Sequence, residues 1–214
     1  MFHWITSSTL LRINWYRKMV KSGRQYTNII GVILFTCVIS QPVYASKSIT
    51  PDPELRQLLI KAVNDSNSFK DRFDAEVWLL DMSNRLTRFV PDTEKRLRLL
   101  KQIHLEATHA NVHPELVLAV IEVESYFDNF AISRAGAQGL MQVMPFWLKE
   151  IGRPGDNLFD IRTNLRMGCT ILKYYLDKSK GDLVEALQRY NGSLRSNRYS
   201  DKVLDRLNKR WFKK

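Results

Sequence analysis

The residues best suited to take part in a reaction are two carboxylates at the end of an apolar run. The run covers residues 116–121, and Glu122 and Glu124 come after it. Glu124 lies seven residues after Val117 and three after Ile121, so these three side chains share one face of a helix. Glu122 falls about half a turn away and points elsewhere. The pattern predicts a buried helix with Glu124 on its apolar face.

Burial of this kind changes the chemistry expected of Glu124. An ionised carboxylate in apolar surroundings is costly, and the carboxyl end of a helix disfavours negative charge. Both effects favour the protonated form and raise the pKa of the side chain. A carboxyl group that stays neutral near pH 7 can serve as a general acid. The alternative interpretation is a structural glutamate that is satisfied by hydrogen bonds.

Helices and loops around this run must present the acid to a substrate. Pro114 suits the first turn of the helix, because its missing N–H would be unpaired there. Polar residues and glycines in 127–138 predict a loop after the helix. Further amphipathic helices are predicted at 54–90, 93–107, 162–175 and 182–190. Asp182 is the expected cap of the last helix and Asn191-Gly192 its stop. Strand signals are weak, so the predicted fold class is mainly α.

Several short motifs resemble those of the soluble lytic transglycosylase family, which carries the SLT domain. They are Glu124-Ser125, Ala131-Ile132-Ser133, Gly139-Leu140-Met141-Gln142, Asn157-Leu158-Phe159-Asp160, Asn164, Gly168 and Tyr190-Asn191-Gly192. Their order and spacing are similar to those of the family, although the family usually has Tyr-Asn-Ala-Gly at the last motif. The resemblance covers about residues 104–205 and implies a lysozyme-like catalytic domain.

The resemblance implies an enzyme that cleaves the β-1,4 bond between N-acetylmuramic acid and N-acetylglucosamine in peptidoglycan. Glu124 would act as the single acid and base, and the product would be a 1,6-anhydromuramyl sugar. This route needs no metal and no cofactor. One alternative is a muramidase-type hydrolase of the same fold, which classically uses a second carboxylate. Another is a catalytically inactive component that binds peptidoglycan in the envelope.

The resemblance also implies which residues contact the glycan. Ser125 would position the acid or the sugar, and Gln142 would bind hydroxyl or acetamido groups. The other implied substrate-binding residues are Met141, Tyr190 and Asn191. Each has a structural alternative, since Met141 and Tyr190 also suit a core and Asn191 also suits a turn.

The first 45 residues have the character of a targeting segment. Five basic residues and no acidic ones precede an apolar run at 29–39, and Val43-Tyr44-Ala45 follows. These features predict a secretory signal peptide at 1–45 and a periplasmic location. The alternative is an uncleaved anchor, which would make the protein membrane-associated. Met19 is a second possible start. Residues 46–100 are then a helical N-terminal region, and 101–214 the SLT domain.

Charge and composition limit the possible partners. The chain has 214 residues and a formal charge of +11, which becomes +6 without the five basic residues of 1–45. A moderately basic exported protein suits an acidic polymer such as the peptidoglycan strand. Envelope protein complexes are further candidate partners, whereas nucleic acid does not fit the export signal. The tail 195–214 is predicted to be a solvated helix. No set of Cys, His and carboxylates has metal-ligand spacing.

Overall fold

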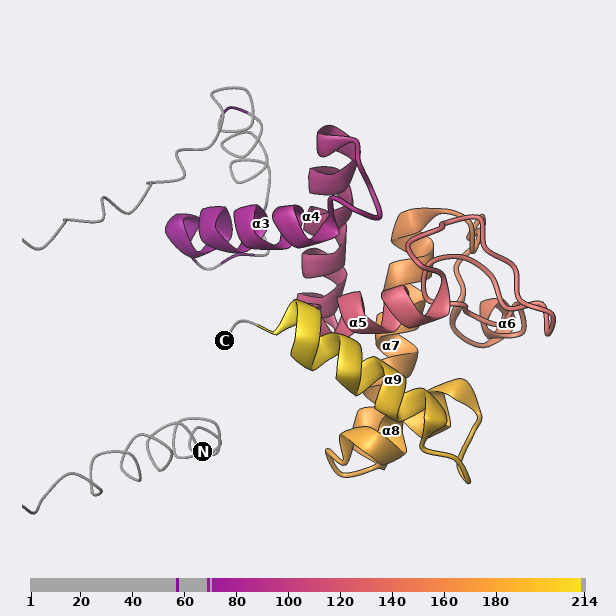
Figure 1. Cartoon of the computed structure of the whole chain (residues 1–214). Helices are drawn as coiled ribbons and strands as arrows, with labels where there is room; N and C mark the ends of the chain where they lie inside the picture. Colours follow the sequence, from indigo (N-terminus) through magenta and orange to yellow (C-terminus); the bar gives the residue numbers. More distant parts are fainter. Residues whose placement is uncertain (1–56, 58–68, 70, 213–214) are drawn as a thin grey trace, which may run out of the picture. The chain divides into compact units, whose positions relative to one another are not determined.

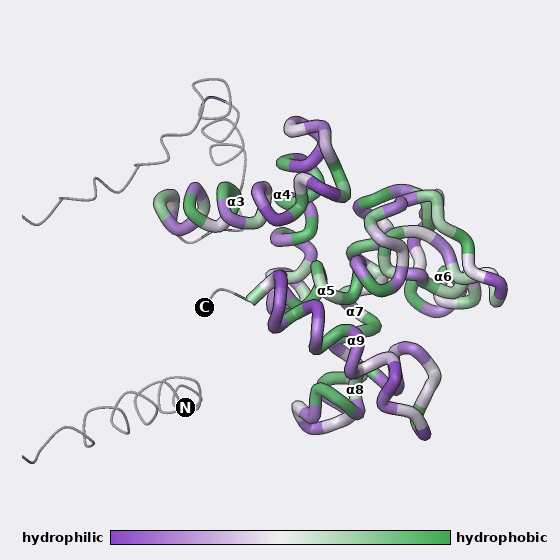
Figure 2. Tube along the Cα trace, viewed as in Figure 1, coloured by the Kyte–Doolittle hydropathy of each residue, from purple (hydrophilic) through white to green (hydrophobic). Residues whose placement is uncertain are grey.

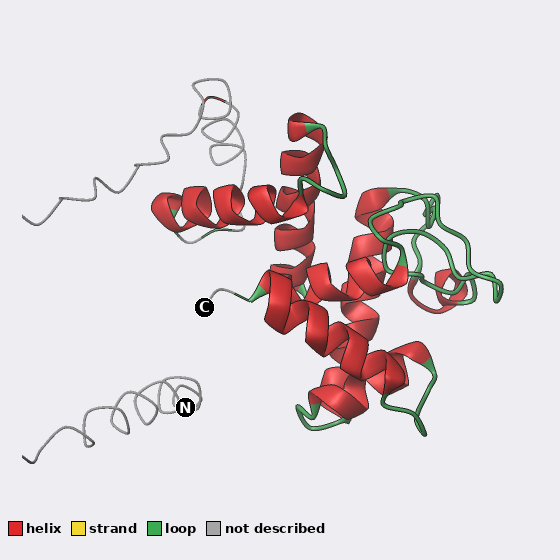
Figure 3. Cartoon of the chain, viewed as in Figure 1, coloured by secondary structure: helices red, strands yellow, loops and turns green. Residues whose placement is uncertain are grey.

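The computed structural model describes Gln57, Phe69 and residues 71–212, and the remaining residues are drawn in grey (Figure 1). The predicted signal peptide at 1–45 and most of the first half of region 46–100 lie outside these residues. In the described part, regular structure is helical (Figure 3), which confirms the mainly α prediction. The helices are α3 (Arg72–Leu86), α4 (Thr93–His109), α5 (Pro114–Glu124), α6 (Trp147–Ile151), α7 (Ile161–Lys178), α8 (Leu183–Asn191), α9 (Arg198–Arg206) and the π-helix η1 (Leu207–Trp211).

Aspartate caps fix the starts of four helices, and Asp71 caps α3 by accepting the N–H groups of Phe73 and Asp74. The side chains of Asp92, Asp160 and Asp182 accept backbone N–H groups in the first turns of α4, α7 and α8. Such caps satisfy donors that a helix start leaves unpaired. At the other end of α8, Gly192 adopts the left-handed conformation with φ 74°. The sequence predictions of a cap at Asp182 and a stop at Gly192 are therefore confirmed.

Helix α5 lies at the centre of the packing. Residues 116–122 are all buried, and α5 packs against α4, α9 and η1. Pro114 occupies the first turn as predicted. Helix α3 packs on α4 and contacts η1, and residues 100 and 101, at the predicted domain boundary, both fall inside α4. Among the described residues, no helix combines the length and the apolar character needed to cross a membrane.

The C-terminal tail is not the solvated helix that its basic sequence predicts. Although α9 is mostly hydrophilic (Figure 2), Tyr199 and Val203 are buried on α5 and α8. Leu207 and Trp211 continue this face into η1, and Trp211 is fully buried. The four residues are spaced by four, which places them on one helical stripe. This amphipathic stripe holds the tail on the core.

The loop between α5 and α7 is fixed to α7 by one buried amide. Asn164 accepts a hydrogen bond from Met141 N at 2.8 Å and donates to the carbonyls of Gln138 and Leu158, both at 2.8 Å. On the same helix, a Cβ at Gly168 would lie 2.4 Å from Met141 Sδ. Gly168 therefore permits a close approach of loop and helix that no larger residue allows.

We expect Gly168→Ala to lower the stability of the protein, because the added methyl must displace the buried side chain of Met141. Overpacking of this type costs about 1–3 kcal/mol. Thermal unfolding at constant pH measures the effect, and Thr170→Ala on the exposed face of α7 is the control. An alanine at 168 with the melting temperature of the wild type would show that the contact is not tight.

Candidate active site

Glu124 is the last residue of α5, and its carboxylate faces the tail of the chain. Tyr199 donates its hydroxyl to Glu124 Oε1 at 2.6 Å. Burial raises the pKa of Glu124 to about 7, and the hydrogen bond from Tyr199 opposes this shift by favouring the charged form. The carboxyl group is thus poised between its two protonation states near neutral pH, as the sequence analysis predicted from burial.

The two tyrosines nearest the carboxylate stay protonated. Burial, reinforced by the charge of Glu124, raises the pKa of both Tyr190 and Tyr199 well above the usual value. A protonated phenol can donate a hydrogen bond, and a phenolate cannot. Tyr199 is therefore a permanent donor to Glu124 in the neutral pH range. Tyr190 donates instead to the carbonyl of Met141 at 2.7 Å.

Two hollows meet at the carboxylate. The first has a volume of about 220 Å³ and is lined on one side by Gln142, Trp147 and Tyr190. The second has a volume of about 330 Å³ and is lined by residues of α9, among them Tyr199. Glu124 and Asn191 line both. The acid therefore lies between two spaces that together can receive groups on either side of a bond.

Gln142 holds the loop that walls the first hollow. Its backbone is left-handed, with φ 49°, and its Nε2 donates to the carbonyls of Ala131 and Gly139 at 3.1 and 3.0 Å. Isolated bridges join Gln138 to Ile132 and to Val143 in the same loop. Both donors of the amide are thus committed to the loop, and Oε1 is the atom left to accept a bond from a ligand.

The predicted binding residues separate into two groups. Gln142, Tyr190 and Asn191 lie around the first hollow with Glu124. Met141 is fully buried, with its side chain against Gly168, so the structure favours its core alternative. Ser125 caps α5, and its hydroxyl donates to Ile121 O at 3.3 Å rather than lining either hollow.

Tyr199 is the site residue that the sequence analysis missed. It lies 75 residues from Glu124 in a tail that was expected to be solvated. The available signal was the apolar spacing of Tyr199, Val203, Leu207 and Trp211, which predicts a buried stripe. In the described part of the chain, no group of three or more His, Cys, Asp or Glu side chains is placed to hold a metal ion.

Comparison with known proteins identifies the family. Residues 102–211 match the family model of the transglycosylase SLT domain, which is just over half of the chain. The chain therefore belongs to this family, and the resemblance drawn from its motifs is confirmed.

Two relatives are similar to this chain over about half of its length. A transglycosylase of Enterobacteria phage PRD1 is 33% identical over 105 residues, which are 46% of this chain and 38% of the phage protein. Membrane-bound lytic murein transglycosylase C of Yersinia pestis (strain Pestoides F) is 32% identical over 111 residues, 44% of this chain and 31% of that protein. The chain thus spans about a third of the length of these relatives.

Two solved structures are similar to this chain at low sequence identity. The lytic transglycosylase Slt of Pseudomonas aeruginosa, solved as an inactive mutant, has a TM-score of 0.41 and 19% identity, and the match covers 67% of this chain and 31% of that one. The 70 kDa soluble lytic transglycosylase of Escherichia coli has a TM-score of 0.36 and 19% identity, with 66% and 31% covered.

We expect Tyr199→Phe to raise the pKa of Glu124 further, because the ring stays and the hydrogen bond that favours the carboxylate is lost. Titration of the ¹³C-labelled carboxyl group by NMR measures this directly. Tyr175→Phe, a similar change on α7, should leave the Glu124 titration unchanged. A Glu124 pKa that stays the same or falls in Tyr199→Phe would contradict the role assigned to this hydroxyl.

Proposed function

We propose that this protein is a peptidoglycan lytic transglycosylase and that Glu124 is its single catalytic acid and base. The observation that carries the proposal is a buried carboxyl group with a pKa of about 7 between two hollows. Among the residues lining those hollows, Glu124 is the only carboxylate. A hydrolase of the usual type needs two. Asp128 is exposed, and its carboxylate accepts Phe130 N at 2.9 Å.

The reaction begins with Glu124 in its protonated form. Its proton passes to the glycosidic oxygen between N-acetylmuramic acid and N-acetylglucosamine, and the bond from that oxygen to C1 of the muramyl sugar breaks. The electron pair leaves with the oxygen, so positive charge develops at C1 and the ring oxygen. The carboxylate that remains lies close to this charge and stabilises it.

The second half of the reaction returns the proton. The C6 hydroxyl of the same muramyl sugar attacks C1, and its proton passes to the Glu124 carboxylate. The product is a 1,6-anhydromuramyl sugar, no water is consumed, and the acid is restored. One group with a pKa near the working pH can serve as acid and then as base. Tyr199 holds the carboxyl group in one orientation through both steps.

The surroundings of the acid suit an anionic glycan. Arg198 and Lys202 line the second hollow, where they can meet carboxylates of lactyl groups or peptides. Gln142 Oε1 and Asn191 offer polar atoms to the sugar hydroxyl and acetamido groups. We therefore assign Gln142, Tyr190 and Asn191 to substrate binding in the first hollow. Tyr190 acts there as a wall, since its hydroxyl is bonded to Met141 O.

Peptidoglycan lies outside the cytoplasmic membrane, so the proposal requires export to the envelope. Residues 1–45, basic and then apolar, are the segment that would direct it. Glycan strands are the partner that the site itself supports.

Product mass tests the reaction type. We expect purified peptidoglycan treated with the enzyme to release muropeptides that end in the anhydro sugar, lighter by one water than hydrolysis products. Glu124→Gln should lower the rate by at least ~10³-fold while keeping the fold, because the amide cannot transfer the proton. Hydrated ends would establish a muramidase, and cleavage unaffected by Glu124→Gln would remove this residue from the mechanism.

The pH dependence follows from the protonation state that starts the reaction. The pKa of Glu124 is raised to about 7, so the active acid is present below this pH and is lost as pH rises through it. We expect kcat/KM to decline about tenfold for each unit above that pKa. The profile is measured on soluble glycan strands with the folded state monitored by circular dichroism. A rate that rises with pH across this range would contradict an acid role for Glu124.

A further inference from the structure

We propose that Arg88 and Phe89, which lie ahead of the residues that match the family, are positioning residues for Glu124. They belong to the connection between α3 and α4, and they hold the segment that ends α5. We call Phe89, Tyr126, Phe127 and Trp211 the aromatic clamp. The inference rests on the proposed function, because it concerns the geometry of the acid that the function assigns.

The backbone directly after Glu124 is in an unfavourable conformation. Tyr126 and Phe127 both have left-handed backbones, with φ of 57° and 69°. Residues with side chains rarely adopt this region, and they keep it only where surrounding contacts enforce it. The N–H groups of Ser125 and Tyr126 both reach Ile121 O, at 3.0 and 3.2 Å. The two left-handed residues therefore set the point at which α5 ends and Glu124 faces out.

The contacts that enforce this conformation come from the α3–α4 connection. The Phe89 ring lies 4.7 Å from that of Tyr126, nearly edge-on, and 4.9 Å from that of Phe127. Arg88 donates to the hydroxyl of Tyr126 at 2.9 Å, and its guanidinium lies 4.7 Å from the centre of the Phe89 ring. One short segment outside the family match thus touches both left-handed residues.

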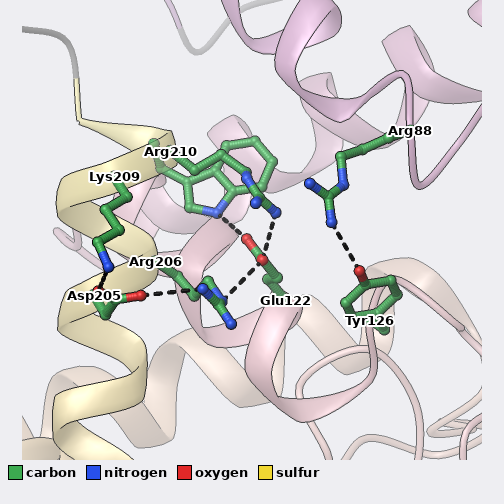
Figure 4. A network of polar contacts seen from close by, with 8 residues as sticks. Arg88, Glu122, Tyr126, Asp205, Arg206, Lys209 and Arg210 are labelled. Carbon is green, nitrogen blue, oxygen red and sulfur yellow. Dashed lines mark hydrogen bonds and ion pairs between the residues drawn. The ribbon is translucent and has the colours of Figure 1, made fainter.

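On the opposite side of α5, η1 and the end of α9 hold Glu122. Glu122, only 2% exposed, accepts hydrogen bonds from Trp211 Nε1 at 2.8 Å and Arg210 Nη1 at 2.6 Å, with Arg206 Nε at 3.2 Å (Figure 4). Trp211 also lies 5.7 Å from the Phe127 ring. Figure 4 shows the Glu122 ion pairs beside the bond from Arg88 to Tyr126. Glu122 anchors the helix, and the aromatic clamp anchors the segment that comes directly after the helix.

These contacts affect Glu124 because the hydrogen bond from Tyr199 and the pKa of the carboxyl group both depend on where that group lies. It faces Tyr199 and, across the first hollow, Tyr190, while Arg198 and Lys202 line the second hollow beside it. Glu122 on the same helix points to the opposite side, toward η1. If the segment after Glu124 relaxes, the last turn of α5 loosens and the carboxyl group moves from Tyr199 toward water. Its pKa then falls toward the ordinary value.

Phe89→Leu in the full chain is the main test, because it keeps apolar volume and removes the ring. We expect kcat to fall by ~10- to 100-fold, as a small misplacement of a catalytic group does, with KM nearly unchanged. The fall of activity on the alkaline side should begin at a lower pH than in the wild type. Phe73→Leu, at an aromatic residue of α3 that is 71% exposed, is the matched control and should behave as wild type.

Two further measurements keep the test decisive. Arg88→Leu alters an exposed side chain, so the fold should tolerate it, and it should shift the pH profile in the same direction by a smaller amount. NMR titration of the Glu124 carboxyl should give a lower pKa in Phe89→Leu, whether or not the substrate is known. An unchanged Glu124 titration with an unshifted profile would reduce Phe89 to a packing residue and overturn the proposal. If the wild type cleaves no peptidoglycan, the proposed function fails, and the titration still decides the positioning role.

Discussion

The structure depends on the cost of keeping one carboxyl group largely out of water. Helix α5 is apolar along its whole middle, and the packing of α4, α9 and η1 around it leaves Glu124 at the point where burial ends. A position deeper in the helix would need a full ionic partner, and a position on the surface would give an ordinary acid. The chain places the residue between these limits. Tyr199 then adds one hydrogen bond that is strong enough to orient the group and too weak to neutralise the effect of burial.

The two glutamates of α5 illustrate how surroundings decide roles. Glu122 and Glu124 are two residues apart and chemically identical, yet Glu122 is surrounded by Arg206, Arg210 and Trp211, and Glu124 by phenols. Ion pairs and hydrogen bonds tie Glu122 to these partners, and it serves as an anchor. Neutral donors leave Glu124 free to change its charge. The helical period separates the two functions by turning one side chain away from the other.

The sequence carried most of the local information and little of the long-range information. Spacing and residue type predicted that Glu124 lies on the apolar face of its helix. They also predicted the helix start at Pro114, the cap at Asp182 and the stop at Gly192, and all of these are confirmed. The contact between Glu124 and Tyr199 joins two helices that are far apart in the chain, so no local pattern predicts it. The orientation of Met141 also depends on tertiary packing, since its side chain lies against Gly168 of α7.

The short helix α6 forms part of the wall of the first hollow. None of its five residues is fully buried, and the loop 152–157 after it is mostly exposed, yet Trp147 from its first turn lines the hollow beside the acid. The wall of this hollow therefore rests on a segment that packs on the edge of the core through Trp147, Leu148 and Ile151. Leu148 and Ile151 pack against the core, and Asp156 accepts a bond from Arg166 of α7, so the residues that anchor this wall are separate from the exposed ones at 153–155. Changes at the exposed residues 153–155 would therefore alter the rim of the hollow with little effect on the helices that hold the acid.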